Sequence, residues 1–405
     1  MRASRLNSFA KAAVLVALSV LLSLQVAEYV AGMMLADPRY AIATSQGHEF
    51  DNRSRLQVIM ECRENSGNCY PSVPPNAFIE KRLQVGNSTL LPLSGVSNAT
   101  VIGCNESGYY SSYTTDKYGF RNPVGSWPDA GPIDLAFVGD SYTVGDCVND
   151  GDHAVDMLRD SFPHVINLAS GGNGPLFELA AIREYLGERD VRYVFWVYFE
   201  RNDLSDLERD WRVETLRNYL QPGFTQNLAG RYREIDKAMR SFVDDRLVEK
   251  IRTTPAVLPN LRTLLWRFRH NQAGPIQAPV TQTQYDLSLF RTILSSAKEA
   301  VGNNGGRLVF VYLPEYERFN LDVPAASWSG APMKDEVLAM VSSLGIDYID
   351  IGPAFRAVAD PLDLFPFRVQ GHYNRQGHEI LAQEIRNYLL RQDDQALDGR
   401  DAGRI

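Results

Sequence analysis

A serine in the middle of the chain stands where an enzyme can hold a nucleophile. Ser141 follows Gly139 and Asp140, and these residues come directly after a short apolar run, residues 133–138. The run predicts a buried strand, and the glycine predicts a tight turn before a helix. Such a turn exposes the hydroxyl, while the helix N-terminus offers free N–H groups to an oxyanion that forms during attack. We therefore take Ser141 as the candidate nucleophile.

Two further strand ends carry groups that could stabilise this oxyanion. Segment 165–175 runs from an apolar strand into a glycine-rich turn, where the backbone can approach a ligand closely. The longer apolar run 191–199 predicts a central parallel strand, buried on both faces, and Asn202 follows it. Ligands bind at this edge of a parallel sheet, so the Asn202 amide could donate to an oxyanion. An ordinary turn and a helix cap are the simpler alternatives.

The candidate general base lies near the C-terminus. His372 and His378 both fall within residues 370–378, although the chain has only 6 histidines, and an amphipathic helix is expected at about residues 379–390. Histidine is the usual base for a serine nucleophile. No cysteine or paired carboxylate frames this loop at the spacing of metal ligands, so we expect neither a metal nor another cofactor.

In this order, the motifs resemble the four sequence blocks of the SGNH (GDSL-type) hydrolase superfamily. Ser141, Asn202 and His372 match the first, third and fourth blocks, and Gly172 stands as the oxyanion glycine of the second. The resemblance covers about residues 133–390, with an insertion. It implies that a Ser–His pair attacks an ester, while the N–H groups of Ser141 and Gly172 and the Asn202 amide hold the oxyanion.

The chain departs from the family's pattern at two positions. Arg201 replaces the usual glycine before the asparagine, and Gln370 stands near where the family carries an Asp that orients the catalytic histidine. A neutral Gln370 could orient the ring but could not stabilise its charge. A Ser–His dyad is the leading hypothesis, with a backbone carbonyl or a carboxylate from Asp360 or Asp363 as alternatives. In the family's pattern His378 belongs to the helix start and is structural.

The N-terminus predicts a targeting helix at residues 1–36. Arg2, Arg5 and Lys11 precede an apolar run, residues 12–24, that could extend to residue 34. This pattern indicates a signal peptide or signal-anchor whose basic end stays in the cytoplasm while the remainder is exported. We favour the uncleaved anchor because no clear cleavage site follows the run, although an Ala-Gly pair near residue 31 leaves cleavage open.

Four cysteines agree with export, because disulfides persist in oxidising compartments. Cys62 and Cys69 flank a polar turn that could close a small loop. A bridge between Cys104 and Cys147 would clamp the N-terminal extension beside Ser141. Four cysteines allow three pairings, and the sequence selects none of them. Buried free thiols are the alternative, and the spacing does not favour a metal or redox role.

Strands alternate with helices after residue 130, which predicts a parallel sheet with right-handed crossovers. We expect an α/β, flavodoxin-like three-layer sandwich with five parallel strands. The charged amphipathic stretches after the third strand predict a helical insertion, which could be a lid, a partner-binding element or a membrane-facing element. The expected segments are the targeting helix 1–36, an irregular extension 37–130, the α/β domain 131–392 with its insertion at about 204–282, and a disordered tail 393–405.

Together these features predict an exported, membrane-tethered serine esterase or O-acyltransferase. An acetyl ester on a cell-surface or secreted glycan is the favoured substrate, by resemblance and location alone. For transfer, a membrane-bound partner could supply the acyl group. The net charge of −8 and the lack of a Lys/Arg block make nucleic acid an unexpected partner. The alternatives are a non-catalytic glycan-binding or polysaccharide-assembly protein of this fold and, third, a lipase.

Overall fold

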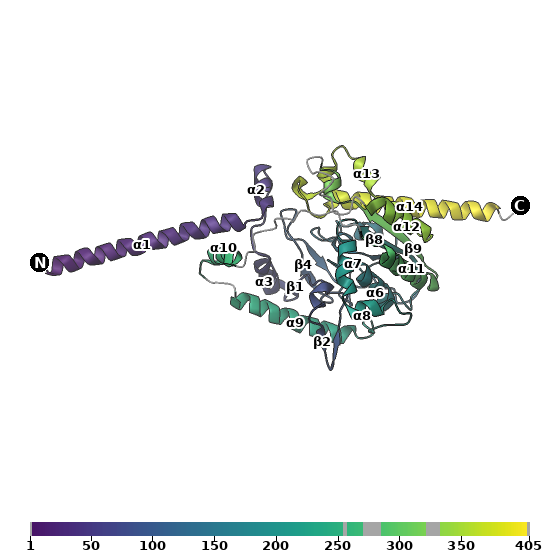
Figure 1. Ribbon diagram of the computed structural model, residues 1–405, viewed down its shortest axis with the longest axis horizontal. Coiled ribbons are helices and arrows are strands. Elements are labelled where there is room, and N and C mark those ends of the chain that lie inside the picture. Colours follow the sequence, from purple (N-terminus) through teal and green to yellow (C-terminus); the bar gives the residue numbers. More distant parts are fainter. Residues whose placement is uncertain (1, 254–256, 270–284, 321–332, 403–405) are drawn as a thin grey trace. The chain divides into compact units, whose positions relative to one another are not determined.

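The computed structural model describes residues 2–253, 257–269, 285–320 and 333–402 (Figure 1). The chain forms two compact units. They are Met1–Gly47 with Asp244–Ala278, and His48–Val243 with Pro279–Ile405. The N-terminal extension from His48 onward thus belongs to the same unit as the candidate catalytic residues.

The smaller unit contains the helices α1 (Arg2–Leu35), α2 (Pro38–Ser45) and α10 (Pro259–Arg269). Within α1, the 25 residues Lys11–Leu35 have a mean hydropathy of 2.0 and are long and apolar enough to cross a membrane. The Glu28 carboxylate of α1 accepts hydrogen bonds from the backbone N–H groups of Asn260 and Leu261, each at 2.8 Å. It thereby satisfies free donors at the start of α10.

The larger unit is built on a five-stranded sheet in which every strand is parallel, as the sequence predicts. Its strands are β6 (Ile133–Val138), β7 (Val165–Asn167), β8 (Val191–Phe199), β9 (Arg307–Leu313) and β10 (Asp347–Asp350). Their order across the sheet is β10-β9-β8-β6-β7. Numbered along the chain, this is the flavodoxin-like order 2-1-3-4-5, whose switch point lies between β6 and β8.

Helices cover both faces of the sheet, because successive strand residues point to opposite sides. On one face, Phe137, Val197 and Val311 belong to a buried cluster with side chains of α5 (Ala154–Arg159), α13 (Gly352–Arg356) and α14 (Arg375–Ala402). On the other face, Tyr198 stacks against Phe290 of α11 (Ser288–Asn303), with ring centroids 5.5 Å apart. α11 in turn packs against α6 (Pro175–Tyr185) and α12 (Lys334–Ser343). The three-layer sandwich is therefore confirmed.

The N-terminal extension is more regular than the sequence indicates. It forms a three-stranded sheet and a hairpin. The sequence does not predict these strands, because each has only three residues and is too short to show a periodicity. Its elements are α3 (Arg55–Ser66), β1 (Cys69–Pro71), the 3-10 helix η1 (Pro75–Phe78), β2 (Leu83–Val85), β3 (Ser88–Leu90), β4 (Thr100–Ile102) and β5 (Ser112–Thr114). A capping box between Ser54 and Gln57 starts α3, and Gly67 in the left-handed region ends it.

The segment after β8 is helical, as expected, with parts of it outside the described residues at 254–256 and 270–284. Its described helices are α7 (Asp203–Trp211), α8 (Glu214–Asn218), α9 (Tyr232–Thr253) and α10. The expectation of a disordered tail after residue 392 differs from the structure, in which α14 continues to Ala402; residues 403–405 lie outside the description.

Candidate active site

Ser141 lies at the C-terminal end of β6, beside the switch point of the sheet, and opens the short helix α4 (Ser141–Val144). Gly139 makes this turn possible. Its φ is +157°, and a Cβ there would lie 2.1 Å from Thr143 Oγ1. The Asp140 carboxylate caps the helix by accepting from Tyr142 N–H at 2.9 Å. The turn therefore presents the Ser141 hydroxyl at the edge of the sheet.

His372 lies directly against this hydroxyl. Its Nε2 is 2.8 Å from Ser141 Oγ, which is hydrogen-bond distance for a base and its nucleophile. Tyr142 holds the histidine loop, because its hydroxyl donates to the Gly371 carbonyl at 2.9 Å and its ring lies 4.9 Å from the imidazole. The structure thus brings together the two residues that the sequence predicts as nucleophile and base.

The third member of the site is Glu106, which the sequence analysis did not identify. Its Oε2 lies 3.3 Å from His372 Nδ1 and accepts from the His372 backbone N–H at 2.7 Å. Glu106 comes from the loop between β4 and β5 of the extension, where Cys104 is bonded to Cys147. A carboxylate on Nδ1 sets the tautomer in which Nε2 can accept a proton, and it stabilises the imidazolium.

The orienting groups considered from the sequence lie elsewhere. The Gln370 side-chain amide donates to Glu317. The Asp360 and Asp363 carboxylates both pair with Arg368, which lowers the pKa of Asp360 below its ordinary value. These three side chains are thus paired elsewhere rather than with the imidazole, and the Ser–His dyad is also not what the structure shows. The carboxylate of Glu106, from a different part of the chain, occupies the position beside His372 Nδ1.

The two histidines of this region have opposite electrostatic environments. Burial alone would lower the pKa of His372, but the hydrogen bond and negative charge of Glu106 outweigh it, so this pKa is raised above its ordinary value. His378 is buried, and burial holds its pKa well below the ordinary value. His378 consequently stays neutral inside the fold and is not placed against Ser141.

The glycine-rich turn after β7 lies beside the nucleophile. Gly172 has φ +69°, a region that favours glycine, and lines the same cavity as Ser141. Two side chains hold its carbonyl: Arg209 Nη2 donates at 2.8 Å and Asn76 Nδ2 at 3.3 Å. A side chain at Gly172 would collide with Asn76, since a Cβ would lie 2.4 Å from Asn76 Nδ2.

Asn202 caps no backbone group with its side chain and instead donates to two carboxylates. Its Nδ2 lies 3.2 Å from Asp140 Oδ2 and 2.9 Å from Asp206 Oδ2. These contacts use both N–H bonds of the amide. For Asn202 to donate to an oxyanion, one carboxylate must give up its hydrogen bond, so its predicted role remains a proposal.

Beneath the site lies a group of acidic side chains that are mostly buried. Burial is the leading cause that raises the pKa of each of them, to about 6 for Asp140 and to about 7 for Asp210. Glu178 and Asp203 are buried fully, and their pKa values are raised well above the ordinary ones. Neither Glu178 oxygen has a hydrogen-bond partner among the described residues. Burial and the repulsion between neighbouring carboxylates thus both favour the protonated forms of Glu178 and Asp203.

This burial gives a prediction for stability. A carboxyl pKa that is raised in the folded state means that the native protein binds more protons than the unfolded chain. The free energy of unfolding must then fall as pH rises from the ordinary pKa of Glu178 toward its raised value. Glu178→Gln removes that titration, so we expect it to melt several degrees above the wild type at pH 8 but not at pH 4.

Melting temperatures at both pH values, followed by circular dichroism, check this prediction. Glu188→Gln is a matched control on an exposed glutamate beyond the end of the same helix. Equal melting temperatures for Glu178→Gln and the wild type at pH 8 would show that the buried carboxyl does not cost stability when it ionises.

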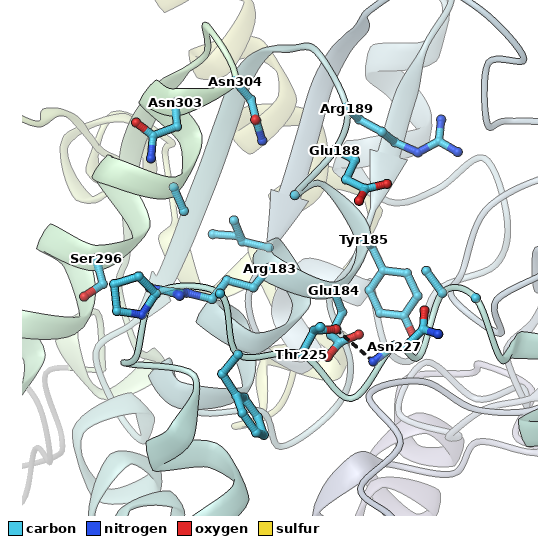
Figure 2. Close-up of a pocket in the computed structure, with 18 of the residues that line it drawn as sticks. Arg183, Glu184, Tyr185, Glu188, Arg189, Thr225, Asn227, Ser296, Asn303 and Asn304 are labelled. Atoms are coloured by element: carbon cyan, nitrogen blue, oxygen red, sulfur yellow. Dashed lines mark hydrogen bonds between the residues drawn. The ribbon is translucent and has the colours of Figure 1, made fainter.

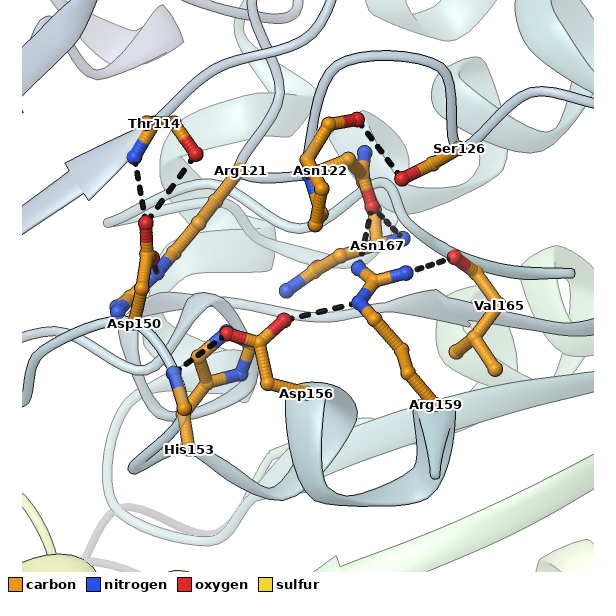
Figure 3. Close-up of polar contacts among 12 residues, drawn as sticks. Thr114, Arg121, Asn122, Ser126, Asp150, His153, Asp156, Arg159, Val165 and Asn167 are labelled. Atoms are coloured by element: carbon orange, nitrogen blue, oxygen red, sulfur yellow. Dashed lines mark hydrogen bonds and ion pairs between the residues drawn. The ribbon is translucent and has the colours of Figure 1, made fainter. Parts of the chain in front are cut away.

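The segment before β6 fastens the loop that follows Ser141 (Figure 3). Arg121 is buried, and its guanidinium donates to the carbonyls of Val144, Gly145 and Val148 and to the Asp150 carboxylate. Three carbonyls of this loop and one of its carboxylates are thus bonded to one rigid side chain. The arrangement fixes the backbone between Ser141 and Cys147.

A second set of contacts, also drawn in Figure 3, connects the same segment to β7. Asn122 accepts from Asn167 N–H at 2.8 Å and from Arg159 Nη2 at 2.8 Å. Arg159 also donates to Asp156, whose other oxygen lies 3.1 Å from Nε2 of the buried His153. Asn122, Arg159 and Asp156 thus satisfy one another away from water, whereas the His153 ring makes no hydrogen bond to the described residues.

Among the described residues, two groups bring possible metal ligands together, and neither has suitable chemistry. Asp150, His153 and Asp156 lie close to each other, but Arg121 and Arg159 already neutralise the two carboxylates. The other group is Cys104, Cys147 and His372, whose sulfur atoms form a disulfide and therefore are not thiolates.

A cavity of about 310 Å³ opens on Ser141 and His372. Its volume is at the small end of the range for ligand sites. More than half of its wall residues come from the N-terminal extension. These are Arg55, Ser72, Pro74, Asn76, Gly103 and Cys104. The extension therefore supplies both the carboxylate behind the histidine and the surface that faces a substrate.

A larger cavity, of about 620 Å³, lies away from this chemistry (Figure 2). Its lining includes Arg183 and Glu188 near the end of α6, Asn303 at the end of α11, and residues of the loop 222–230. Both helices end there and lead into the N-terminal ends of β8 and β9, at the sheet edge opposite Ser141. No histidine among the described residues lines it. We therefore place the active site at the smaller cavity.

No family model and no curated protein matches this chain. Solved structures give distant likenesses at 11–14% identity. One is a putative acylhydrolase from Bacteroides fragilis, with TM-score 0.35, 12% identity and coverage of 65% of this chain and 90% of that one. Another is LAE5, an alpha/beta hydrolase enzyme from the metagenome of Lake Arreo, with TM-score 0.32, 13% identity, and 63% and 94% covered.

A third is a catalytic mutant of an acetylxylan esterase from Geobacillus stearothermophilus, with TM-score 0.29, 14% identity, and coverage of 64% of this chain and 94% of that one. Superpositions this loose assign no activity to this chain. What the chain can do follows from the contacts around Ser141.

Proposed function

We propose that the protein is a serine ester hydrolase or O-acyltransferase of the SGNH type, with a small acyl group, acetyl favoured, as the group transferred. The observation that carries this proposal is the line of contacts from Glu106 through His372 to Ser141 Oγ, beside a small polar cavity. Each of these groups has a defined task in acyl transfer.

In this mechanism, His372 Nε2 takes the proton of Ser141 as Oγ attacks the acyl carbon. Glu106 stabilises the imidazolium that forms. The N–H groups of Ser141 and Gly172 hold the oxyanion, joined by the Asn202 amide when Asp140 or Asp206 releases it. The tetrahedral intermediate collapses, and the leaving alcohol takes the proton from His372. Water in hydrolysis, or an acceptor hydroxyl in transfer, then attacks the acyl carbon while His372 takes its proton. The bond between Ser141 Oγ and the acyl group breaks, and His372 returns the proton to Ser141 Oγ.

Features that suit an exported protein support a cell-surface or secreted glycan as the molecule that carries the ester. The N-terminal helix α1 suits a membrane anchor, and the two disulfides, Cys62–Cys69 and Cys104–Cys147, suit an oxidising compartment. We propose that α1 tethers an exported catalytic unit to the membrane. Transfer would then draw its acyl group from a membrane-bound partner.

The two rival functions have less support. The missing family aspartate would favour a non-catalytic protein, but Glu106 supplies a carboxylate at the imidazole from another part of the chain. A lipase needs an apolar channel for its acyl chain, whereas Arg55, Asn76 and Asp146 line the cavity beside Ser141.

Hydrolysis of p-nitrophenyl acetate, butyrate and octanoate by the full chain in detergent tests the proposal. We expect acetate to be turned over fastest, and we expect Ser141→Ala and His372→Ala to reduce turnover to the background rate. Activity that survives Ser141→Ala would disprove the nucleophile. A preference for octanoate would favour a lipase, and the absence of turnover in every form would favour a binding protein.

A further inference from the structure

The wall of the catalytic cavity carries polar groups that the Ser–His–Glu relay does not use. Arg55 stands at the start of α3, and Asn76 lies in the 3-10 helix η1. Asp146 follows α4 and lies against the glycine-rich turn, since a Cβ on Gly171 would be 3.1 Å from its Oδ2. All three line the cavity that opens on Ser141.

The Arg55 guanidinium is held in place by hydrogen bonds, but one of its nitrogen atoms has no hydrogen-bond acceptor in the described part of the chain. Its Nε and Nη2 donate to the Ile102 carbonyl, with Nε at 2.9 Å. Its Nη1 hydrogen-bonds to none of the described residues, and none of their carboxylates lies within ion-pair distance of it. Burial lowers the pKa of the guanidinium, and the negative charge of nearby groups such as Asp146 offsets this only in part.

Asp146 presents the complementary group. Its carboxylate makes no hydrogen bond to the described residues, and burial raises its pKa, against the positive charges of His372, Arg121 and Arg55. The cavity therefore has an arginine donor, a carboxylate acceptor and, in Asn76, an amide that can both donate and accept. An apolar ligand would leave Arg55 Nη1, the Asp146 carboxylate and the Asn76 amide oxygen without a partner among the described residues.

Charge decides between polar ligands. Asp146 and Glu106 both carry carboxylates around His372, and Arg55 is the one arginine among the described residues that line the cavity. A substrate with a carboxylate next to its ester would meet more negative than positive charge. A neutral sugar avoids this repulsion, and its neighbouring hydroxyls can accept from Arg55 while they donate to Asp146.

We propose that Arg55, Asn76 and Asp146 form a subsite for a neutral sugar ring that carries the acyl ester attacked by Ser141. This inference rests on the proposed esterase function, and it adds that the alcohol part of the ester substrate is a neutral sugar. It makes the N-terminal extension a specificity element, because two of the three residues come from it.

The test compares two acetyl esters with the same enzyme. The probes are partially O-acetylated xylotetraose, which keeps free hydroxyls, and p-nitrophenyl acetate, which has no sugar. The measured quantity is the ratio of kcat/KM for the first to that for the second. We expect Arg55→Met to lower this ratio by about 10–100-fold, the loss of one or two hydrogen bonds to a charged group. The isosteric Asp146→Asn should also lower it.

Arg63→Met is the matched control, because Arg63 lies on the same helix and donates to the Cys69 carbonyl outside the cavity. A ratio that stays the same in both Arg55→Met and Asp146→Asn would overturn the subsite. So would a wild-type preference for partially O-acetylated oligogalacturonate, which is the acidic counterpart. Melting curves show whether each variant is folded.

A binding measurement separates failure of the subsite from failure of the esterase function. Calorimetry with Ser141→Ala should detect partially O-acetylated xylotetraose, and Ser141→Ala with Arg55→Met should bind it at least 10-fold more weakly. Turnover of p-nitrophenyl acetate without such binding would overturn the subsite alone. Loss of all turnover, with binding that Arg55→Met weakens, would overturn only the esterase function.

Discussion

Glu106→Gln is expected to lower kcat for p-nitrophenyl acetate by up to about 10⁴-fold, the effect of an Asp-to-Asn change in a Ser-His-Asp triad. Glutamine keeps the size of the side chain, but it cannot stabilise the imidazolium, and its NH2 group can favour the wrong histidine tautomer. The carboxylate oxygen that is replaced lies 3.3 Å from His372 Nδ1 and also accepts the His372 backbone N–H.

The pH profile distinguishes this electrostatic role from a structural one. The base must be neutral to act, and Glu106 raises the pKa of His372 above its ordinary value. Wild-type kcat/KM should therefore rise with pH through a pKa above 6.5, and Glu106→Gln should move this acidic limb to lower pH. Glu61→Gln, on an exposed glutamate of α3, is the control that should move neither kcat nor the limb. Unchanged values for Glu106→Gln would restore the Ser–His dyad.

The positions of Ser141 and His372 could be predicted because each follows a local pattern that the sheet then brings to one edge. Parallel strands all end at the same edge, so Ser141 after β6 and Asn202 after β8 had to lie near each other. His372 lies just before the last helix and reaches the same edge. For these residues, the order of the strands and the positions of the turns are enough to place the side chains at the same edge of the sheet.

Glu106 could not be found in this way. It precedes His372 by 266 residues and belongs to a loop between two three-residue strands, where no periodicity marks its place. The one available indication was Cys104, two residues earlier, whose expected bridge to Cys147 would place this loop beside the nucleophile. Gln370 is only two residues from His372 in the sequence, but its side chain contacts Glu317, so closeness along the chain does not place it against the imidazole.

Asn202 illustrates a different limit. Its place at the end of β8 follows from the strand, but its hydrogen bonds depend on Asp140 and Asp206, which lie on different elements. Burial raises the pKa of both carboxyls, and that shift reflects the whole environment rather than any local motif. The sequence could therefore place the amide but not show that its donors are already used.

The second large effect is expected from removing the Cys104–Cys147 disulfide. The bridge closes a 43-residue loop and links the segment between β4 and β5, which carries Glu106, to the segment after Ser141. Replacing both cysteines with serine should lower the free energy of unfolding by roughly 4 kcal/mol in the chain-entropy model. It should also lower kcat by about 100-fold, because a carboxylate displaced by about 1 Å no longer orients the base.

Cys62→Ser with Cys69→Ser is the matched control, since that bridge closes a loop of only 7 residues and does not border Ser141. It should cost roughly 2 kcal/mol in the same model and leave kcat close to that of the wild type. Denaturant unfolding and p-nitrophenyl acetate turnover, measured on all three proteins well below their melting temperatures, separate the two effects. Equal kcat values in both disulfide variants would mean that packing and the Arg121 contacts hold Glu106 against His372 without the bridge. A selective loss in the Cys104 and Cys147 variant would instead show that a covalent link in the extension keeps the catalytic carboxylate in place.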